Sequence, residues 1–180
     1  MGIVADAGGI PGILTSGLPS PLGPPNASTS IDLDARLGGV RADAMQTLTD
    51  TYTWTNLSTF LDPGGKIIWY HGVSDPWFSA NDTLDYYERA AAANGKRFLD
   101  SSRLYMVPGA GHCGGGANTF DQFDLLTALD DWVEADKAPG SIPARRKAPT
   151  PAERPLCPYP TYPFYLGGDE SRIESFQCRS

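Results

Sequence analysis

The stretch KIIWYHGVSDPWFSANDTLDYYERAAAANGKRFLDSSRLYMVPGAGHCGGG, residues 66–116, decides the fold. Two short runs of apolar and β-prone residues, 66–72 and 103–109, each end in glycine, as buried strands do where they enter a loop. Between them, residues 79–95 have polar capping candidates at the start, an alanine-rich body and a final glycine, which predicts a helix. A strand, a helix and a second strand predict a parallel pair in an α/β sheet.

The segments on either side of this stretch have a different character. Residues 118–140 carry an apolar stripe at spacings of three and four, which is typical of an amphipathic helix. The stripe comprises Phe120, Phe123, Leu126, Leu129, Trp132 and Val133. We divide the chain into an irregular Gly- and Pro-rich segment at 1–50, an α/β portion at 51–140 and a Pro- and aromatic-rich tail at 141–180. One short helix is predicted over 42–49.

Composition limits the classes of partner. With 180 residues, 41% of them hydrophobic, the chain is long enough to bury one core. The formal net charge is -7, and no run of Lys and Arg is longer than that at 145–147, so we expect neither a nucleic-acid nor a membrane partner. No uninterrupted apolar stretch approaches the roughly 18 residues of a membrane span, and the N-terminus lacks the features of a signal peptide. Small molecules or other proteins are the expected partners.

Each predicted strand is followed by a loop with a chemically useful side chain. VSDPWFS (73–79) carries Asp75, and PGAGHCGGG (108–116) carries His112. Because ligand sites in open parallel sheets lie beyond the carboxyl ends of the strands, we expect the two loops to meet. An acid followed after 37 residues by a histidine has the order and spacing of the last two members of a Ser-Asp-His triad. In such a triad the imidazole takes the serine proton and the carboxylate fixes its tautomer.

Each of these residues also has a plainer interpretation. Asp75 in SDP is a common turn former, and a histidine such as His112 in a glycine-rich loop is usually a surface or structural residue. His71 either satisfies backbone groups at the strand end or supports the site from behind the acid. A metal site made of His71, Asp75, His112 and Cys113 lacks the short ligand spacing of familiar zinc sites, so no metal is expected.

Further stretches lie in order along the chain: GGKIIWYHGVSDPWFS, YY, RLYMVPGAGHCGGG, FDLLTALDDWVEADKAPGSIPA, RPLCPYP, and YLGGD followed by SFQC. Together, over approximately residues 50–180, they resemble the C-terminal part of the tannase and feruloyl esterase family of α/β hydrolases. The resemblance implies a serine esterase acting on aromatic carboxylic esters, with Asp75 as the acid and His112 as the general base. Trp77 and Phe78, which follow the acid, either line the substrate pocket or pack in the core.

The resemblance also implies a role for each of the three cysteines. Cys157 and Cys178 match the family's C-terminal disulfide. Cys113 matches a cysteine that pairs with another directly before the nucleophilic serine, which would hold a histidine loop whose glycines lose much entropy on ordering. Disulfides favour an oxidising compartment, so we expect a secreted or periplasmic protein whose signal lies outside this chain.

The sequence departs from the family at the nucleophile. No G-x-S-x-G occurs, and in α/β hydrolases the serine precedes the acid, so it should lie upstream of Asp75. The residues before Asp75 cannot also hold the oxyanion loop and the family's lid domain. We therefore expect a C-terminal fragment that needs an N-terminal portion carrying Cys-Ser. The lid's calcium site should be absent with the lid, and no cofactor is expected.

Two alternatives to an esterase stay open. The first is a catalytically incomplete remnant that acts as a binding or interaction module through the aromatic side chains of its tail. These are Tyr159, Tyr162, Phe164 and Tyr165. The second, weaker alternative is a metal hydrolase.

Overall fold

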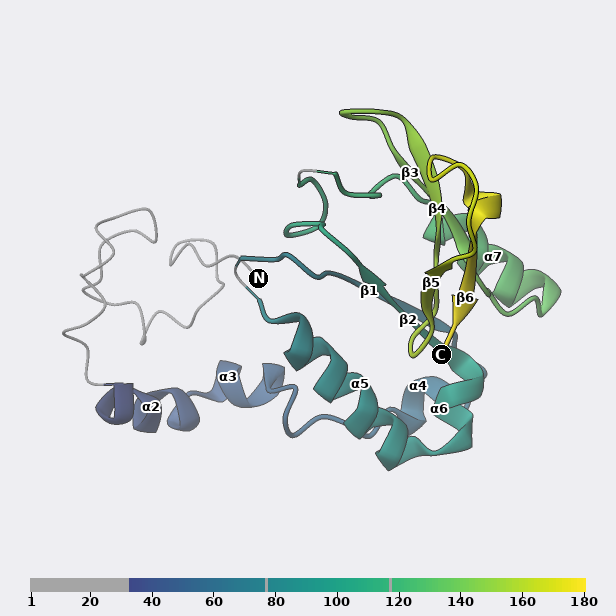
Figure 1. The fold of residues 1–180 in the computed structure, drawn as a ribbon. Coiled ribbons are helices and arrows are strands. Elements are labelled where there is room, and N and C mark those ends of the chain that lie inside the picture. Colours follow the sequence, from purple (N-terminus) through teal and green to yellow (C-terminus); the bar gives the residue numbers. More distant parts are fainter. Residues whose placement is uncertain (1–32, 77, 117) are drawn as a thin grey trace. The chain divides into compact units, whose positions relative to one another are not determined.

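The computed structural model describes residues 33–76, 78–116 and 118–180 (Figure 1). The chain divides into two compact units, Met1–Trp54 and Thr55–Ser180. In the first unit, α3 (Ala44–Thr49) matches the predicted short helix and is capped by Asp43, whose side chain accepts from the Gln46 N–H at 3.0 Å. Helix α2 (Leu33–Ala42) forms where we expected irregular backbone. An acidic residue in its first turn and a basic residue in its last turn complement the helix dipole.

The second unit is built on the predicted parallel pair. Strand β1 (Ile67–Gly72) runs parallel to β2 (Ser102–Val107), with Ile67 opposite Ser102 and Gly72 opposite Val107. The connection holds α5 (Ala80–Asn94), whose first turn is capped by the Ser79 side chain, and α6 (Lys96–Ser101). A short helix, α4 (Ser58–Leu61), precedes β1. Because the register is continuous to the carboxyl ends of both strands, the two following loops start side by side.

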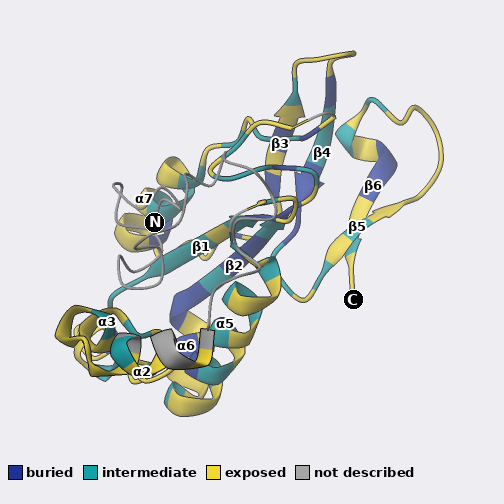
Figure 2. Ribbon diagram, turned by 90° about the vertical axis from the view of Figure 1, so that its left-hand side faces the viewer, coloured by how far each residue is buried: buried dark blue, intermediate teal, exposed yellow. Residues whose placement is uncertain are grey.

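Strand β2 lies between two apolar clusters. Leu104 packs on one face with Tyr87 and Phe98 from the connecting helices, whereas Tyr105 and Val107 pack on the other face. Neighbouring side chains of a strand point to opposite faces, so one strand serves both clusters. Figure 2 shows the buried residues running along β2. The burial of both faces explains why 103–109 is almost continuously apolar.

The amphipathic helix is shorter than its sequence pattern suggested. Helix α7 (Leu125–Ala135) begins after Asp124, whose side chain accepts from the Thr127 N–H at 2.9 Å. This cap leaves the two phenylalanines of the stripe outside the helix, although both still pack against the core. The prediction was wrong for Leu126 and Val133, which are 78% and 58% exposed. The helix instead buries the face that holds Trp132, which is 2% exposed.

The tail, which we expected to be irregular, forms two antiparallel pairs. Strands β3 (Ile142–Arg146) and β4 (Ala152–Leu156) make one, and β5 (Tyr162–Tyr165) and β6 (Phe176–Arg179), preceded by the 3₁₀ turn η3 (Ile173–Ser175), make the other. Pro143 lies opposite Pro155, so both prolines share one non-hydrogen-bonded position and the ladder loses no donor. Among the described residues, no helix is long and apolar enough to cross a membrane.

Two links hold the tail to itself and to the sheet. Cys157 and Cys178 form the expected disulfide, with Cα atoms 5.6 Å apart. The Tyr159 N–H donates to the Leu104 carbonyl at 2.7 Å, which ties the start of the second hairpin to β2. The disulfide prediction is confirmed, and the tail packs along the same sheet that carries the two loops.

Candidate active site

The structure brings the predicted acid and histidine together. The loop after β1 places Asp75, and the loop after β2 places His112, so that His112 Nδ1 lies 2.7 Å from Asp75 Oδ2. An ionised carboxylate only accepts, so Nδ1–H is the donor and Nε2 is left as the basic nitrogen. The Asp75 side chain is 4% exposed and that of His112 is 27% exposed. A buried acid behind a partly exposed imidazole is the arrangement that orients a general base.

Phe78 contacts both members of this pair. Its backbone N–H donates to Asp75 Oδ1 at 3.2 Å, so the carboxylate is oriented through both of its oxygens. Its ring lies against the imidazole of His112, with centroids 5.4 Å apart and planes inclined by 44°. Phe78 therefore lies at the site, whereas Trp77 falls outside the described residues.

Backbone hydrogen bonds hold the acid loop against the histidine loop. The Val73 N–H donates to the Val107 carbonyl at 3.0 Å, and the Ser74 N–H donates to the Ala110 carbonyl at 2.9 Å. Gly72 makes this close approach possible, because a Cβ there would lie 2.2 Å from the carbonyl oxygen of Gly111. The distance between the acid and the histidine is thus set by the backbone of both loops.

The histidine loop closes on itself in a tight turn. The Gly111 N–H donates to the Gly115 carbonyl at 2.9 Å. Gly116 has φ +121°, and a Cβ there would lie 2.2 Å from the Gly109 carbonyl oxygen, so only glycine fits. Cys113 has φ 60° and is exposed; among the described residues it is the cysteine outside the disulfide. The turn presents His112 and Cys113 together at the surface.

A carboxylate that sequence reasoning missed anchors this turn. Asp121 Oδ2 accepts from the Gly115 N–H at 2.7 Å, and this hydrogen bond holds the pKa of the Asp121 carboxyl below its usual value of 3.8. Asp121 lies nine positions after the histidine, in a segment we assigned to the helix stripe. The one sequence signal for this role is that Asp121 is the first acidic residue after the glycine run, five positions beyond its end.

We expect the Gly115 amide resonance to titrate with a midpoint below pH 3.8. A depressed pKa means that the bond stabilises the folded turn above the unfolded value and that this contribution is lost as the pH falls through the lower folded value. Two-dimensional NMR across an acid titration measures the midpoint. Asp121→Asn should remove the titration at Gly115 and serves as the control. A midpoint at or above 3.8 would contradict the assignment of this anchor.

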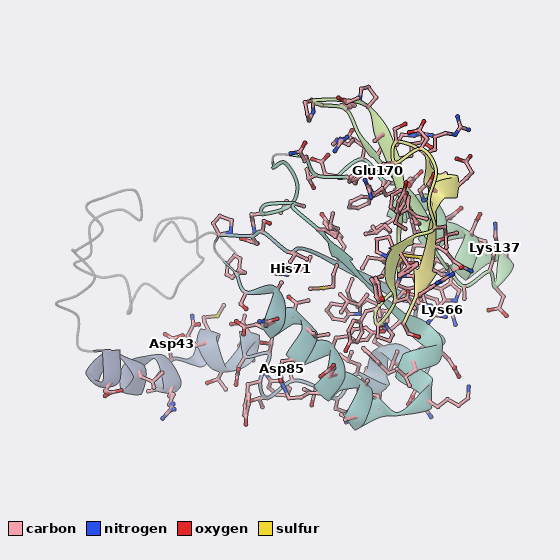
Figure 3. The ribbon with its side chains drawn as sticks, in the orientation of Figure 1. Asp43, Lys66, His71, Asp85, Lys137 and Glu170 are labelled. Atoms are coloured by element: carbon pink, nitrogen blue, oxygen red, sulfur yellow. A yellow bond between two sulfur atoms is a disulfide. The ribbon has the colours of Figure 1, made fainter. Side chains whose placement is uncertain are left out.

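The second histidine stands behind the acid. His71 Nε2 lies 3.3 Å from the Phe78 carbonyl oxygen and 3.9 Å from Asp75 Oδ2, while Nδ1 lies 2.8 Å from the Thr83 hydroxyl. Figure 3 labels His71 at the end of β1, beside the start of α5. His71 thus makes a hydrogen bond to a backbone carbonyl and also lies next to the acid, so its contacts fit both interpretations drawn from the sequence.

Other features of the described residues lie apart from this pair. No group of three or more His, Cys, Asp or Glu side chains that could hold a metal ion occurs in the described part of the chain. A cavity of about 260 Å³ lies against the tail, lined by Met106, Pro108, Tyr159 and Tyr162 among others. Tyr159 itself is engaged within the chain, because its hydroxyl donates to Glu88 at 2.5 Å.

Comparisons with known proteins agree on one family. A family model described as tannase and feruloyl esterase matches residues 26–179. Mono(2-hydroxyethyl) terephthalate hydrolase of Piscinibacter sakaiensis is 48% identical over 132 residues, which cover 70% of this chain and 22% of that protein. Feruloyl esterase B of Aspergillus niger is 31% identical over 143 residues, covering 68% of this chain and 27% of the relative. The chain thus spans roughly a quarter of the length of these relatives.

Solved structures give the same result for the fold. An esterase from Aspergillus oryzae superposes with a TM-score of 0.69 and 24% identity, covering 85% of this chain and 34% of that one. Tannin acyl hydrolase from Aspergillus niger gives a TM-score of 0.62 over 82% of this chain and 28% of that one. These likenesses confirm the predicted α/β fold class.

Proposed function

This chain belongs to the tannase and feruloyl esterase family, and from that premise we propose that it supplies the acid and general base of a carboxylic ester hydrolase. The nucleophile in this proposal is a serine that this chain does not supply, because no G-x-S-x-G occurs in the sequence. The observation that carries the proposal is the 2.7 Å contact between His112 Nδ1 and a nearly buried Asp75 carboxylate.

The proposed mechanism assigns one step to each side chain. His112 Nε2 takes the proton of the serine hydroxyl as its oxygen attacks the ester carbonyl, and returns that proton to the departing alcohol. Water then loses a proton to the same nitrogen, attacks the acyl-enzyme and releases the acid, after which the proton goes back to the serine. Asp75 holds the ring in the Nδ1–H tautomer and stabilises the imidazolium that forms in both steps. The Phe78 ring, beside the imidazole, adds a favourable contact to that cation.

We propose esters of aromatic acids as the substrates. Support comes from the names of the relatives, since a terephthalate half-ester and a feruloyl ester both carry an aromatic acyl group next to the bond that is cleaved. Phe78 supports the same choice, because its half-buried ring lies next to the general base, where an aromatic acyl group can stack on it. The proposed steps use only protein side chains and water.

We also propose a structural role for Cys113. It lies directly beside His112 at the exposed end of the turn, and we propose that it forms a disulfide to a cysteine preceding the serine. Such a bond would fix the distance between nucleophile and base. Together with the Cys157–Cys178 disulfide, it supports an extracytoplasmic location, secreted or periplasmic, for the complete protein.

A chimera tests the proposal. The matching 132-residue segment of the Piscinibacter sakaiensis hydrolase is replaced by the corresponding residues of this chain, and the release of terephthalate from mono(2-hydroxyethyl) terephthalate is followed by chromatography. We expect the chimera to hydrolyse the ester and its His112→Ala variant to be inactive. A chimera that unfolds cooperatively and hydrolyses the ester equally well with and without His112 would refute the assignment of the base.

A further inference from the structure

We infer that Thr83 and His71 are positioning residues that hold the acid loop in register with His112, an inference that rests on the proposed function above. Neither residue touches the reacting atoms. They connect helix α5 to the turn that carries Asp75 and Phe78, and each link is a contact between described residues.

The contacts of His71 define its tautomer. Nε2 faces the Phe78 carbonyl oxygen at 3.3 Å, and a carbonyl oxygen only accepts, so Nε2 carries the proton. Nδ1 then has a lone pair and accepts from the Thr83 hydroxyl at 2.8 Å. The His71 side chain is 12% exposed, so water competes little for these bonds. The ring is therefore held from both sides in a single orientation.

The Thr83 hydroxyl acts between elements. A threonine within a helix commonly donates to a carbonyl of the preceding turn of its own helix. In α5 the hydroxyl instead reaches across to His71 near the end of strand β1, 12 positions earlier in the chain. The helix thus contributes a fixed donor to the imidazole, and the orientation of the imidazole depends on it.

The orientation of His71 controls the acid through Phe78. The same residue whose carbonyl accepts from His71 donates its N–H to Asp75 Oδ1, and its ring packs on His112. If the His71 ring rotates, the Phe78 carbonyl loses its donor, so Phe78 is held less firmly and its N–H no longer fixes the Asp75 carboxylate. The pair of Asp75 and His112 should then remain close but become misaligned, which lowers catalytic efficiency without removing a catalytic group.

Spectroscopy of the chain itself tests the inference without reference to activity. Nitrogen-15 NMR of the imidazoles should show His71 as the Nε2–H tautomer, and the His112 Nδ1–H proton should be protected from exchange with water. Thr83→Val, which keeps the shape and removes the donor, should shift the His71 Nδ1 resonance and expose the His112 proton to exchange. Thr83→Ser, which restores a hydroxyl, should return both signals. An unchanged His112 proton in Thr83→Val would overturn the inference.

A second pair of variants keeps the test independent of Thr83. His71→Gln places an amide donor where Nε2 lies, and His71→Asn places its polar group where Nδ1 lies. Because the Phe78 carbonyl is the link to the acid, and the Gln variant keeps the donor to it while losing the Thr83 contact, we expect the Gln variant to protect the His112 proton better than the Asn variant does. The opposite order, or equal protection in both, would contradict the inference.

Kinetics in the chimera then separates positioning from general stability. Thr83→Val should lower kcat about tenfold, because the loss of one hydrogen bond misaligns the acid and the base. KM should change by less than about twofold. Thr83→Ser should recover most of kcat. A rise in KM at constant kcat would overturn a positioning role. An inactive parent chimera counts against the proposed function alone, because the NMR result decides the role of His71 and Thr83 by itself.

Discussion

Asp75→Asn in the chimera should lower kcat about 10⁴-fold while the protein stays folded. The amide has nearly the volume of the carboxylate and can keep the Phe78 N–H bond through its oxygen, so the loop should retain its shape. Its NH₂ group, however, cannot accept from His112 Nδ1–H and favours the wrong tautomer of the imidazole. Initial rates of ester hydrolysis, together with the thermal unfolding curve of each protein, measure the two effects separately.

Asp169→Asn is the matched control for this substitution. Asp169 is an exposed carboxylate in the turn before η3, where it accepts from the Ser171 N–H at 2.9 Å, so the same chemical change is made in a loop that does not contact the histidine. We expect its kcat to stay within about twofold of the parent chimera. A loss of less than tenfold in Asp75→Asn, with the control unchanged, would mean that Asp75 does not orient the base.

The parts of the site that follow from local patterns could be predicted from the sequence. Strands β1 and β2 form within the two apolar runs, and helix α5 forms within the segment that begins with a capping residue. A parallel pair brings the loops that follow its strands to one edge of the sheet. That reasoning was enough to bring Asp75 and His112 together. It could not supply a distance, because the 2.7 Å contact depends on which backbone groups of the two loops bond to each other.

The contacts that the sequence did not reveal are those that hydrophobic spacing and composition do not encode. Asp121 anchors the histidine turn, although the apolar spacing around it is that of a helix. The cap by Asp124, which starts the helix after Asp121, was found only in the folded chain. Likewise, the tail has too many prolines to predict strands, yet in β3 and β4 two of them face each other at one position of the ladder. In both cases, particular backbone hydrogen bonds decide the structure, and neither apolar spacing nor proline content reveals them.

Gly72→Ala should be a strongly destabilising single-methyl substitution at this site. The new Cβ would lie 2.2 Å from the Gly111 carbonyl oxygen and 2.6 Å from that of Ala110, and both are backbone atoms that cannot rotate away. The two loops must therefore separate, which breaks the Ser74 N–H bond to Ala110 and draws Asp75 away from His112. We expect a loss of at least about 2 kcal/mol in the free energy of unfolding, measured by urea denaturation.

The matched control for Gly72 is Gly140→Ala. A Cβ at Gly140 meets no atom within 4 Å, so the same methyl group is added without a clash. Its free energy of unfolding should change by less than about 0.5 kcal/mol, as expected for a surface substitution. In the chimera, Gly72→Ala should also remove most of the hydrolytic activity, because the acid and the base move apart together with their loops. If Gly72→Ala were as stable as the control, the close approach of the two loops could not be what sets the geometry of the acid and the base.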